Sequence, residues 1–269
     1  MISPEVDAPV TTPQVGLFVT CLVDLHRPSV GFATIKLLEQ AGCSVVVPEA
    51  QTCCGQPAFN SGDDETSRDI ARNTINAFEE FDYIVVPSGS CAGMMIKHYP
   101  ELFKDEPDWS NRARHFADRC HELLSFLVDV RGMTEFGACF DATVTYHDSC
   151  SGLRELGIKQ QPRQLMQGVK GLVLKEMEDT DVCCGFGGTF CVKYPDISER
   201  MVSDKVALAQ QTGASTLLAG DMGCLLNISG RLSRLEQPLR VYHFAEVLAG
   251  MAVGPAIAEG AVVAPALSK

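Results

Sequence analysis

The sequence lacks the features that mark nucleic-acid-binding, membrane and secreted proteins. No block of five or more Lys and Arg occurs, and 22 basic against 34 acidic residues give a formal net charge of −12. Such a chain has no electrostatic footprint for phosphate backbones or anionic membranes, so we expect no nucleic-acid partner. No apolar run reaches the roughly 18 residues of a membrane span. Residues 1–14 lack the basic and apolar regions of a secretory signal, so we expect a flexible N-terminus and a cytoplasmic protein.

The sequence also lacks C-x-x-C pairs, although it contains 12 cysteines. Structural zinc sites usually space paired ligands by two to four residues, so zinc knuckles are disfavoured. In a reducing compartment so many cysteines favour metal ligation over disulfides. Two alternatives stay open, a vicinal disulfide at each adjacent pair and a non-redox scaffold built on zinc or bare thiols. Nucleotide binding is not indicated, because the run Gly185–Gly188 has neither the G-x-G-x-x-G spacing nor a Walker lysine.

The cysteines that are present form an internal repeat. In each half a lone cysteine is followed by Cys-Cys-Gly and then by another cysteine. These residues are Cys21, Cys53, Cys54, Gly55 and Cys91 in the first half, and Cys150, Cys183, Cys184, Gly185 and Cys224 in the second. The intervals are 31 and 36 residues in the first half and 32 and 39 in the second. The halves therefore read as two copies of one unit.

The segments between the cysteines predict an α/β fold. Strand-like apolar runs lead toward the motifs at Val15–Val19, Ser44–Pro48, Tyr83–Val86, Ala142–Tyr146, Gly171–Lys175 and Thr216–Ala219. Helical patterns cover 30–40, 63–81 and 198–211, with a further helix or helix pair over 109–130 and a strand and helix over 240–251. This alternation predicts two pseudo-repeated Rossmann-like units with mainly parallel sheets, 15–135 and 140–250, followed by a flexible tail, 251–269.

The eight repeated cysteines are the candidate ligands of an iron-sulfur cluster. Each falls at the C-terminal end of a predicted strand or in the following loop, where open α/β sheets place their sites. A cluster presents several irons that each need a thiolate, so adjacent cysteines can bind different corners of one object. Gly55 and Gly185 allow the backbone to turn with positive φ close to inorganic sulfide.

The remaining cysteines and one histidine have other interpretations. Cys43, Cys120 and Cys139 have no counterpart in the other half, so we interpret them as small apolar core residues. Cys191 could reach a cluster, but the equivalent stretch of the first half has no cysteine, so we interpret it as a bystander. His147 is either a donor to a cluster sulfur or a proton shuttle, or else a satisfied loop histidine.

This arrangement resembles the cysteine-rich CCG-domain family, whose hallmark is a lone cysteine, a distant Cys-Cys-Gly and a further cysteine, usually in two copies. The resemblance covers residues 15–248. The run 183–190 and the stand-alone length are most similar to the lactate-utilization branch, whereas the CCG-containing subunits of heterodisulfide reductase and glycolate oxidase are more distant. Heterodisulfide reductase motifs end in C-x-x-C, whereas Met94 and Asn227 occupy that place here, which puts its noncubane cluster in doubt.

The resemblance implies an iron-sulfur electron-transfer subunit of a complex that oxidises L-lactate, or another 2-hydroxyacid, to the 2-oxoacid. It implies a [4Fe-4S] cluster in each repeat, one of which can be empty. It also implies two partner subunits, one of them with ferredoxin-type clusters. The alternative is a cluster that acts directly on a thiol or disulfide substrate. The residues themselves specify neither lactate nor a flavin site, and they indicate no catalytic residue.

Overall fold

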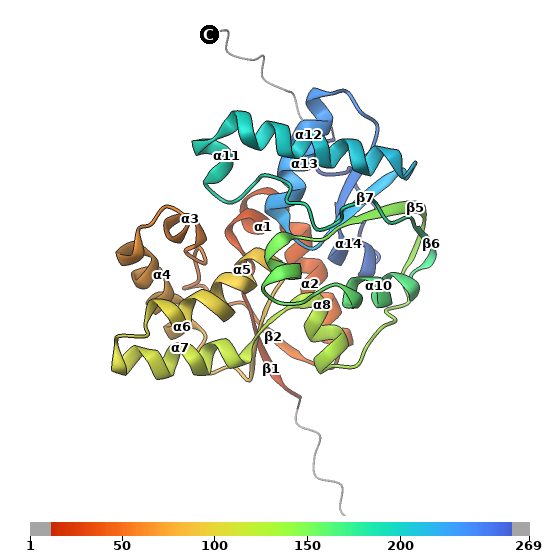
Figure 1. Ribbon diagram of the computed structural model, residues 1–269. Coiled ribbons are helices and arrows are strands. Elements are labelled where there is room, and N and C mark those ends of the chain that lie inside the picture. The colour runs from red at the N-terminus through yellow and green to blue at the C-terminus, as the bar shows by residue number, and fades with distance from the viewer. Residues whose placement is uncertain (1–11, 260–269) are drawn as a thin grey trace, which may run out of the picture.

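Two four-stranded, all-parallel sheets form the framework of the computed structural model, which describes residues 12–259 (Figure 1). The strand orders are β2-β1-β3-β4 and β6-β5-β7-β8, so the same topology occurs twice. The strands are β1 Gln14–Leu17, β2 Ser44–Val46, β3 Tyr83–Val86, β4 Cys120–Glu122, β5 Cys139–His147, β6 Lys170–Leu174, β7 Thr216–Ala219 and β8 Arg240–His243. The predicted fold class of two pseudo-repeated α/β units is confirmed.

Helices connect these strands and cover both sheets. In the first unit they are α1 Cys21–His26, α2 Pro28–Gln40, α3 Gln56–Phe59, α4 Asp64–Ala77, α5 Gly89–Gly93, η1 Met94–His98, α6 Tyr99–Leu102, α7 Pro107–Arg119, α8 Leu123–Ser125 and η2 Phe126–Val130. In the second unit they are α9 Cys150–Arg154, α10 Gln160–Gln167, α11 Phe190–Lys193, α12 Pro195–Gln211, α13 Met222–Arg234 and α14 Phe244–Leu248. Here η1 and η2 are π-helical segments.

The helices predicted over 30–40, 63–81 and 198–211 correspond to α2, α4 and α12. The strand and helix predicted over 240–251 correspond to β8 and α14. The helix pair predicted over 109–130 corresponds to α7 and α8, but strand β4 lies between them, and the sequence pattern does not predict it. Three residues are too short to show a period of two, so only the pairing of β4 with β3 reveals the strand.

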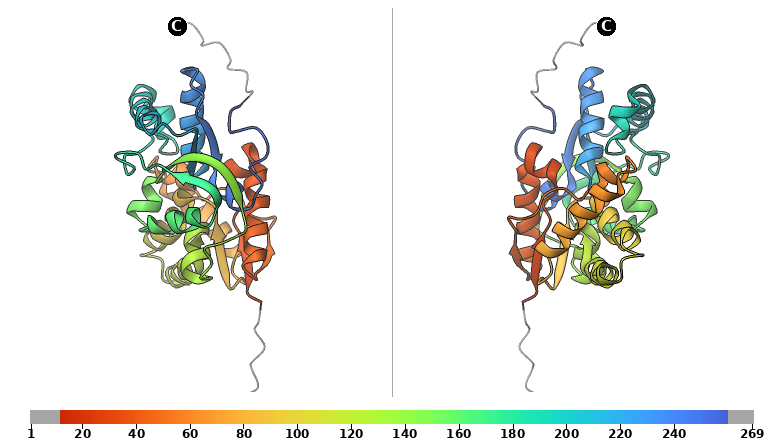
Figure 2. Two further views of the ribbon diagram at one scale, coloured as in Figure 1. Left: turned by 90° about the vertical axis from the view of Figure 1, so that its right-hand side faces the viewer. Right: turned by 90° about the vertical axis from the view of Figure 1, so that its left-hand side faces the viewer.

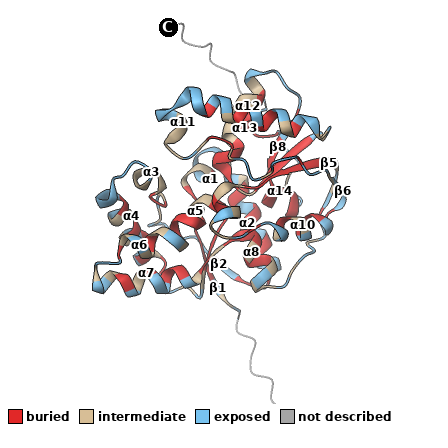
Figure 3. Ribbon diagram, viewed as in Figure 1, coloured by how far each residue is buried: buried red, intermediate tan, exposed pale blue. Residues whose placement is uncertain are grey.

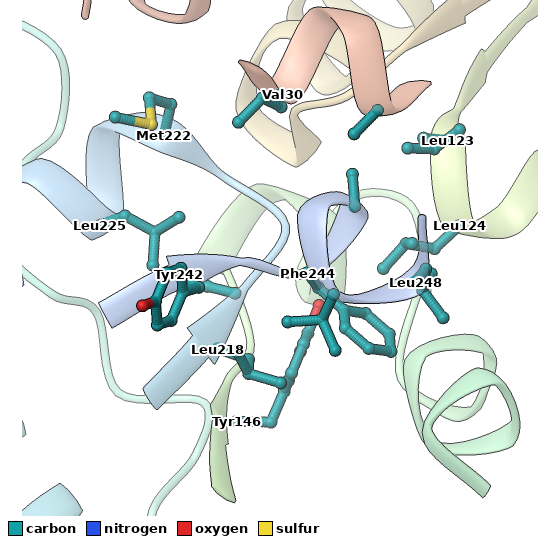
Figure 4. Close-up of a cluster of buried hydrophobic side chains, with 14 of the residues drawn as sticks. Val30, Leu123, Leu124, Tyr146, Leu218, Met222, Leu225, Tyr242, Phe244 and Leu248 are labelled. Atoms are coloured by element: carbon teal, nitrogen blue, oxygen red, sulfur yellow. The ribbon is translucent and has the colours of Figure 1, made fainter. Parts of the chain in front are cut away.

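Alternating side chains of the first sheet enter two different cores. Ile84 and Val86 pack on one face with α4, α6 and α7, whereas Val85 between them points to the opposite face. That opposite face joins one continuous core with the second unit, as the cluster around Val30, Leu123 and Phe244 shows (Figure 4). Figure 3 shows the buried residues gathered along the strands and on the helix faces turned toward them.

The two units contact each other reciprocally. Helix α2 packs on α14, and α10, the counterpart of α2, packs on α8, the counterpart of α14. Figure 2 shows the α1–α2 segment beside the C-terminal strand and helix in both side views. A buried ion pair reinforces this contact, because Glu246 is 1% exposed and its Oε1 lies 2.9 Å from Arg27 Nε and accepts from Ser29 Oγ at 2.7 Å.

Close approach of α5 and α9 brings the cysteine loops of the two units together. A Cβ on Gly89 would lie 2.4 Å from Ser149 Oγ and 3.0 Å from the Cα of Gly152, so a larger residue would push the helices apart. Cys91 lies in α5, and Cys150 begins α9. The absence of a side chain at Gly89 therefore allows these two cysteine-bearing helices to lie side by side.

Part of the predicted tail packs on the second sheet. The N–H of Ile257 donates to Val241 O at 2.9 Å, and Ala256 and Ile257 are buried. Of the segments predicted to be flexible, 1–14 and 251–269, residues 1–11 and 260–269 lie outside the described residues. Within 12–259 no helix combines the length and apolarity that crossing a bilayer requires.

Glu122 generates a prediction about pH and stability. Its carboxylate is 3% exposed and accepts from the N–H groups of Leu124 and Ser125 at 2.8 and 3.0 Å. Burial raises the pKa of Glu122 from 4.5 to about 8. Between pH 4.5 and 8 the folded state keeps a proton on Glu122 that the unfolded state has released. The stabilising contribution of this protonated side chain is therefore fully present below pH 4.5 and is lost as the pH rises through 8.

We therefore expect Glu122 to lower the free energy of unfolding by at most about 1.4 kcal/mol per pH unit across this window. Urea unfolding of wild type and Glu122→Gln, at matched iron content from about pH 5 to 8.5, measures the difference. The variant should lose this slope. Identical pH dependence in both proteins would contradict the prediction.

Candidate metal centre

The repeated cysteines gather at the carboxyl edges of the two sheets, at helix starts or in the loops before them. Cys21 is the first residue of α1, and Cys91 lies in the first turn of α5, whose N-cap Ser88 accepts from the Cys91 N–H. Cys53 and Cys54 immediately precede α3, whose N-cap is Gly55. The second unit repeats this placement, with Cys150 starting α9, Cys183 and Cys184 in the long loop after β6, and Cys224 in the first turn of α13.

The four cysteines of the first unit line one cavity of about 200 Å³. The Sγ atoms of Cys21 and Cys53 are 3.9 Å apart, and those of Cys54 and Cys91 are 3.4 Å apart. Hydrogen bonds from the Cys21 and Cys54 thiols and from the N–H of Gly55 lower the pKa of Cys53, while the pKa of Cys54 is raised. Gly55 has the predicted positive φ, 84°. Ionisation is thus favoured at Cys53 over Cys21 and Cys54.

The four cysteines of the second unit line a second cavity of about 200 Å³. Hydrogen bonds from the Cys150 and Cys184 thiols and from the N–H of Gly185 at 3.3 Å lower the pKa of Cys183. The pKa values of Cys150 and Cys184 are raised, as they are for their counterparts. Gly185 also has positive φ, 83°. The lone cysteine and the adjacent pair therefore have pKa shifts of the same direction in both units.

Two unrelated side chains hold the adjacent-cysteine loops in place. The hydroxyl of Tyr99 donates to Cys54 O at 2.9 Å, and the amide of Asn227 donates to Cys184 O at 2.9 Å. Asn227 stands where heterodisulfide reductase motifs have the last cysteine of C-x-x-C. In this protein its side-chain amide binds the backbone of the Cys183–Cys184 loop instead. The sequence repeat does not predict this equivalence, because the two donors stand at different distances from their motif cysteines.

The two cavities share a wall. Gln56, Ser90, Phe186, Gly188 and Asp221 line both of them. Asp221 Oδ2 accepts from Ser90 N at 2.8 Å and from Ser88 Oγ at 3.0 Å in the first unit, and its Oδ1 accepts from the N–H of Cys224 at 3.4 Å in the second. This buried carboxylate therefore ties the two cysteine loops to each other.

His147 lies behind the second set of thiols. Its ring is fully buried, and one ring nitrogen and the Sγ atoms of Cys184 and Cys224 all lie within 4.8 Å of one another. Burial, and then the charge of Lys205, lowers the pKa of His147 to about 4, so the ring is neutral at pH 7. Neither ring nitrogen has a hydrogen-bond partner among the described residues, and His147 is the last residue of β5, so the donor interpretation is the one that these observations favour.

The other cysteines lie outside both cavities. Cys43 and Cys120 are buried as predicted, but Cys139 is exposed at the first residue of β5, so its interpretation as a core residue is wrong. Cys191 contacts Gly188 O with its thiol at 3.6 Å and lines neither cavity. All twelve cysteines are free, so neither adjacent pair forms a vicinal disulfide.

Sequence reasoning misses several polar residues of the site. His98 and Glu155 line the second cavity, with His98 Nε2 3.3 Å from Glu155 Oε2. They come from η1 and the end of α9 in different units, so no sequence spacing relates them. Asp221 does carry a sequence signal, because it precedes Cys224 by three residues, as Ser88 precedes Cys91.

The residues present fit an iron-sulfur cluster in each cavity. Four thiols converge in each one, and the glycine turns admit a bulky group close to the backbone. The family model of the CCG cysteine-rich domain matches residues 15–96 and 144–229. The chain belongs to the CCG cysteine-rich domain family. The two matched segments each contain one complete set of four thiols.

Relatives within this family match almost the whole chain. Lactate utilization protein A of Bacillus cytotoxicus is 51% identical over 87% of this chain and 98% of its own length. Lactate utilization protein A 2 of Bacillus mycoides is 49% identical over the same shares. A crystal structure of a hypothetical protein from Helicobacter pylori has the same fold, with a TM-score of 0.65 at 12% identity, covering 91% of this chain and 50% of that one.

The ligand assignment generates a prediction with a matched control. Cys54 and Cys120 are both 3% exposed, but only Cys54 lines a cavity. We expect Cys54→Ser to remove up to about half of the bound iron, because each unit should hold one cluster. Cys184→Ser should do the same in the second unit, whereas Cys120→Ser should leave the iron content unchanged. Iron and sulfide analysis of anaerobically purified protein measures this, and equal iron in all three variants would refute the assignment.

Proposed function

We propose that this protein is the iron-sulfur electron-transfer subunit of an L-lactate oxidation system. The observation that supports this most directly is the presence of two four-thiol cavities that share a wall. When bound there, an iron-sulfur cluster supplies one-electron redox chemistry. The chain's own residues would hold the thiolates, exclude water and keep the two centres adjacent, so that an electron can pass between them without a further carrier.

The lining of the cavities favours electron transfer over substrate chemistry. Among residues 12–259, no Lys or Arg lines either cavity, while Asp221 lines both and Glu155 lines the second. A 2-hydroxyacid carries a carboxylate, which is usually bound by a guanidinium or ammonium group. We therefore propose that a partner oxidises the hydroxyacid itself.

Four thiols in each cavity support a [4Fe-4S] cluster in each unit. The place of a fifth thiol is taken by the buried side chain of Met94 in the first unit and by Asn227 in the second, whose amide is engaged with Cys184 O. Heterodisulfide reductase-like action on a thiol or disulfide substrate needs an iron open to that substrate, so we place it second.

The names of the relatives, which are lactate utilization proteins, support an assembly devoted to lactate. We propose two partner subunits, one with ferredoxin-type clusters, that bring electrons from lactate as it becomes pyruvate. The twelve free thiols favour a reducing compartment, which agrees with a cytoplasmic location.

The first test is whether the isolated chain contains redox-active iron. Anaerobically purified protein should contain iron and acid-labile sulfide in equal amounts and give an EPR signal on reduction with dithionite. Zinc in place of iron would support the non-redox scaffold and would overturn the proposal.

The second test separates a carrier from a catalyst. L-Lactate should leave the EPR and visible spectra of the isolated chain unchanged and should reduce it only when the two partner proteins are present. Reduction by lactate alone would assign the substrate chemistry to this chain. Reduction by neither combination would overturn the proposed role in lactate oxidation.

A further inference from the structure

The two cysteine sites differ at one buried position directly behind the thiols. His147 stands three residues before Cys150, and Phe18 stands three residues before Cys21. Sheet register makes them equivalent, since Leu17 pairs with Val85 of β3 and Tyr146 pairs with Leu218 of β7, the matching strand. The repeat therefore places an imidazole in one site where the other has a phenyl ring.

Only the histidine can interact with the sulfurs through a hydrogen bond. His147 and Phe18 are both fully buried. A ring nitrogen of His147 lies within 4.8 Å of the Cys184 and Cys224 sulfurs, and both ring nitrogens lack partners among the described residues. An unpaired N–H in the interior is unfavourable, so a bound thiolate or sulfide would be its natural acceptor. Phe18 packs against Phe78 and offers no donor.

The two sites also differ in a buried lysine, whose positive charge would likewise favour the reduced form of the second centre. Lys205 is fully buried in α12, where its ammonium donates to Asp179 O at 2.8 Å, and its charge interacts with Cys184. Ser67 O lies 3.7 Å from where a Cβ on Gly55 would stand, and Ser198 O lies 2.9 Å from the same point on Gly185. These serines are therefore equivalent, and Thr74 in α4 matches Lys205 in α12, because each stands seven residues after its serine. The second site thus has a nearby ammonium group where the first site has a threonine. Because the Glu155 carboxylate lines only the second cavity and has the opposite charge, the inference rests on the difference between His147 and Phe18.

We infer that His147 donates its N–H to a sulfur of the second site and raises the reduction potential of that centre above that of the first. This inference rests on the proposed iron-sulfur function. Reduction adds negative charge, and hydrogen bonds to the sulfurs together with a nearby cation stabilise that charge. The imidazole has an N–H to donate in each tautomer, so the effect does not require it to gain or lose a proton.

The consequence is a direction for electron transfer within the chain. With clusters bound, one electron would leave the reduced first centre, oxidising it, and would reduce the second centre across the wall formed by Ser90, Phe186 and Asp221. The donor partner would then deliver electrons on the side of Cys21, and the acceptor would collect them on the side of Cys183. His147 would act in this through a sulfur and not on iron or substrate, so we call it a positioning residue.

Exchanging the two residues tests the inference. His147→Phe should lower the higher of the two midpoint potentials and leave the lower one unchanged. Phe18→His should raise the lower potential by placing a donor behind the first site. EPR-monitored redox titration of the full chain measures both, and each change should be about tenfold in the oxidised-to-reduced ratio, or about 59 mV for a one-electron couple.

The controls keep the inference separate from the proposed function. Wild type without two reducible iron-sulfur signals would end the proposed function, whereas two signals whose potentials do not move in His147→Phe would overturn the inference alone. Loss of iron from His147→Phe at the second site would also overturn it, because that result makes His147 a ligand. His147→Gln retains an N–H donor and should keep the wild-type potential with full iron content.

Discussion

Crowding of thiols into buried cavities is the constraint on which the site depends. With Sγ atoms 3.4 Å apart for Cys54 and Cys91, four thiolates could not coexist without a compensating cation, since desolvation and mutual repulsion both oppose ionisation. Thiol and backbone donors lower the pKa of one cysteine in each set, Cys53 and Cys183, and so favour ionisation at that sulfur. Cluster iron would replace the thiol protons, which is why the thiols form a ready-made ligand set.

The pairing of the two units makes the two ligand sets neighbours. Asp221 accepts hydrogen bonds from Ser88 and Ser90 of the first unit and caps the first turn of α13 in the second. Gly89 has no side chain, so α5 and α9 can approach each other closely. Approximate two-fold packing of one unit on the other thus places two equivalent sites at one shared wall. The internal repeat makes the two sites similar. A single difference at equivalent positions, such as His147 against Phe18, is then enough to distinguish them.

Several features of the fold could be predicted because they depend on local pattern. The strand runs before each motif, the helices α2, α4 and α12, and the positive φ of Gly55 and Gly185 all follow from residue type and period. Strand β4 could not be predicted, because three residues carry no period and the strand exists through its partner β3. Cys139 has no counterpart in the other half, and this leads to the prediction that it is a core residue. It is exposed, because it is the first residue of β5.

Residue order alone is enough to specify the repeat, the eight cysteines with their glycine turns, and the family, because spacing and residue type need no coordinates. Folding in three dimensions sets which sulfurs meet, makes the two cavities adjoin, and turns His147 toward Cys184 and Cys224 without a partner among the described residues. These contacts join residues far apart along the chain. They are fixed by the register of parallel strands and by the packing of one unit on the other, and no short segment encodes either of these.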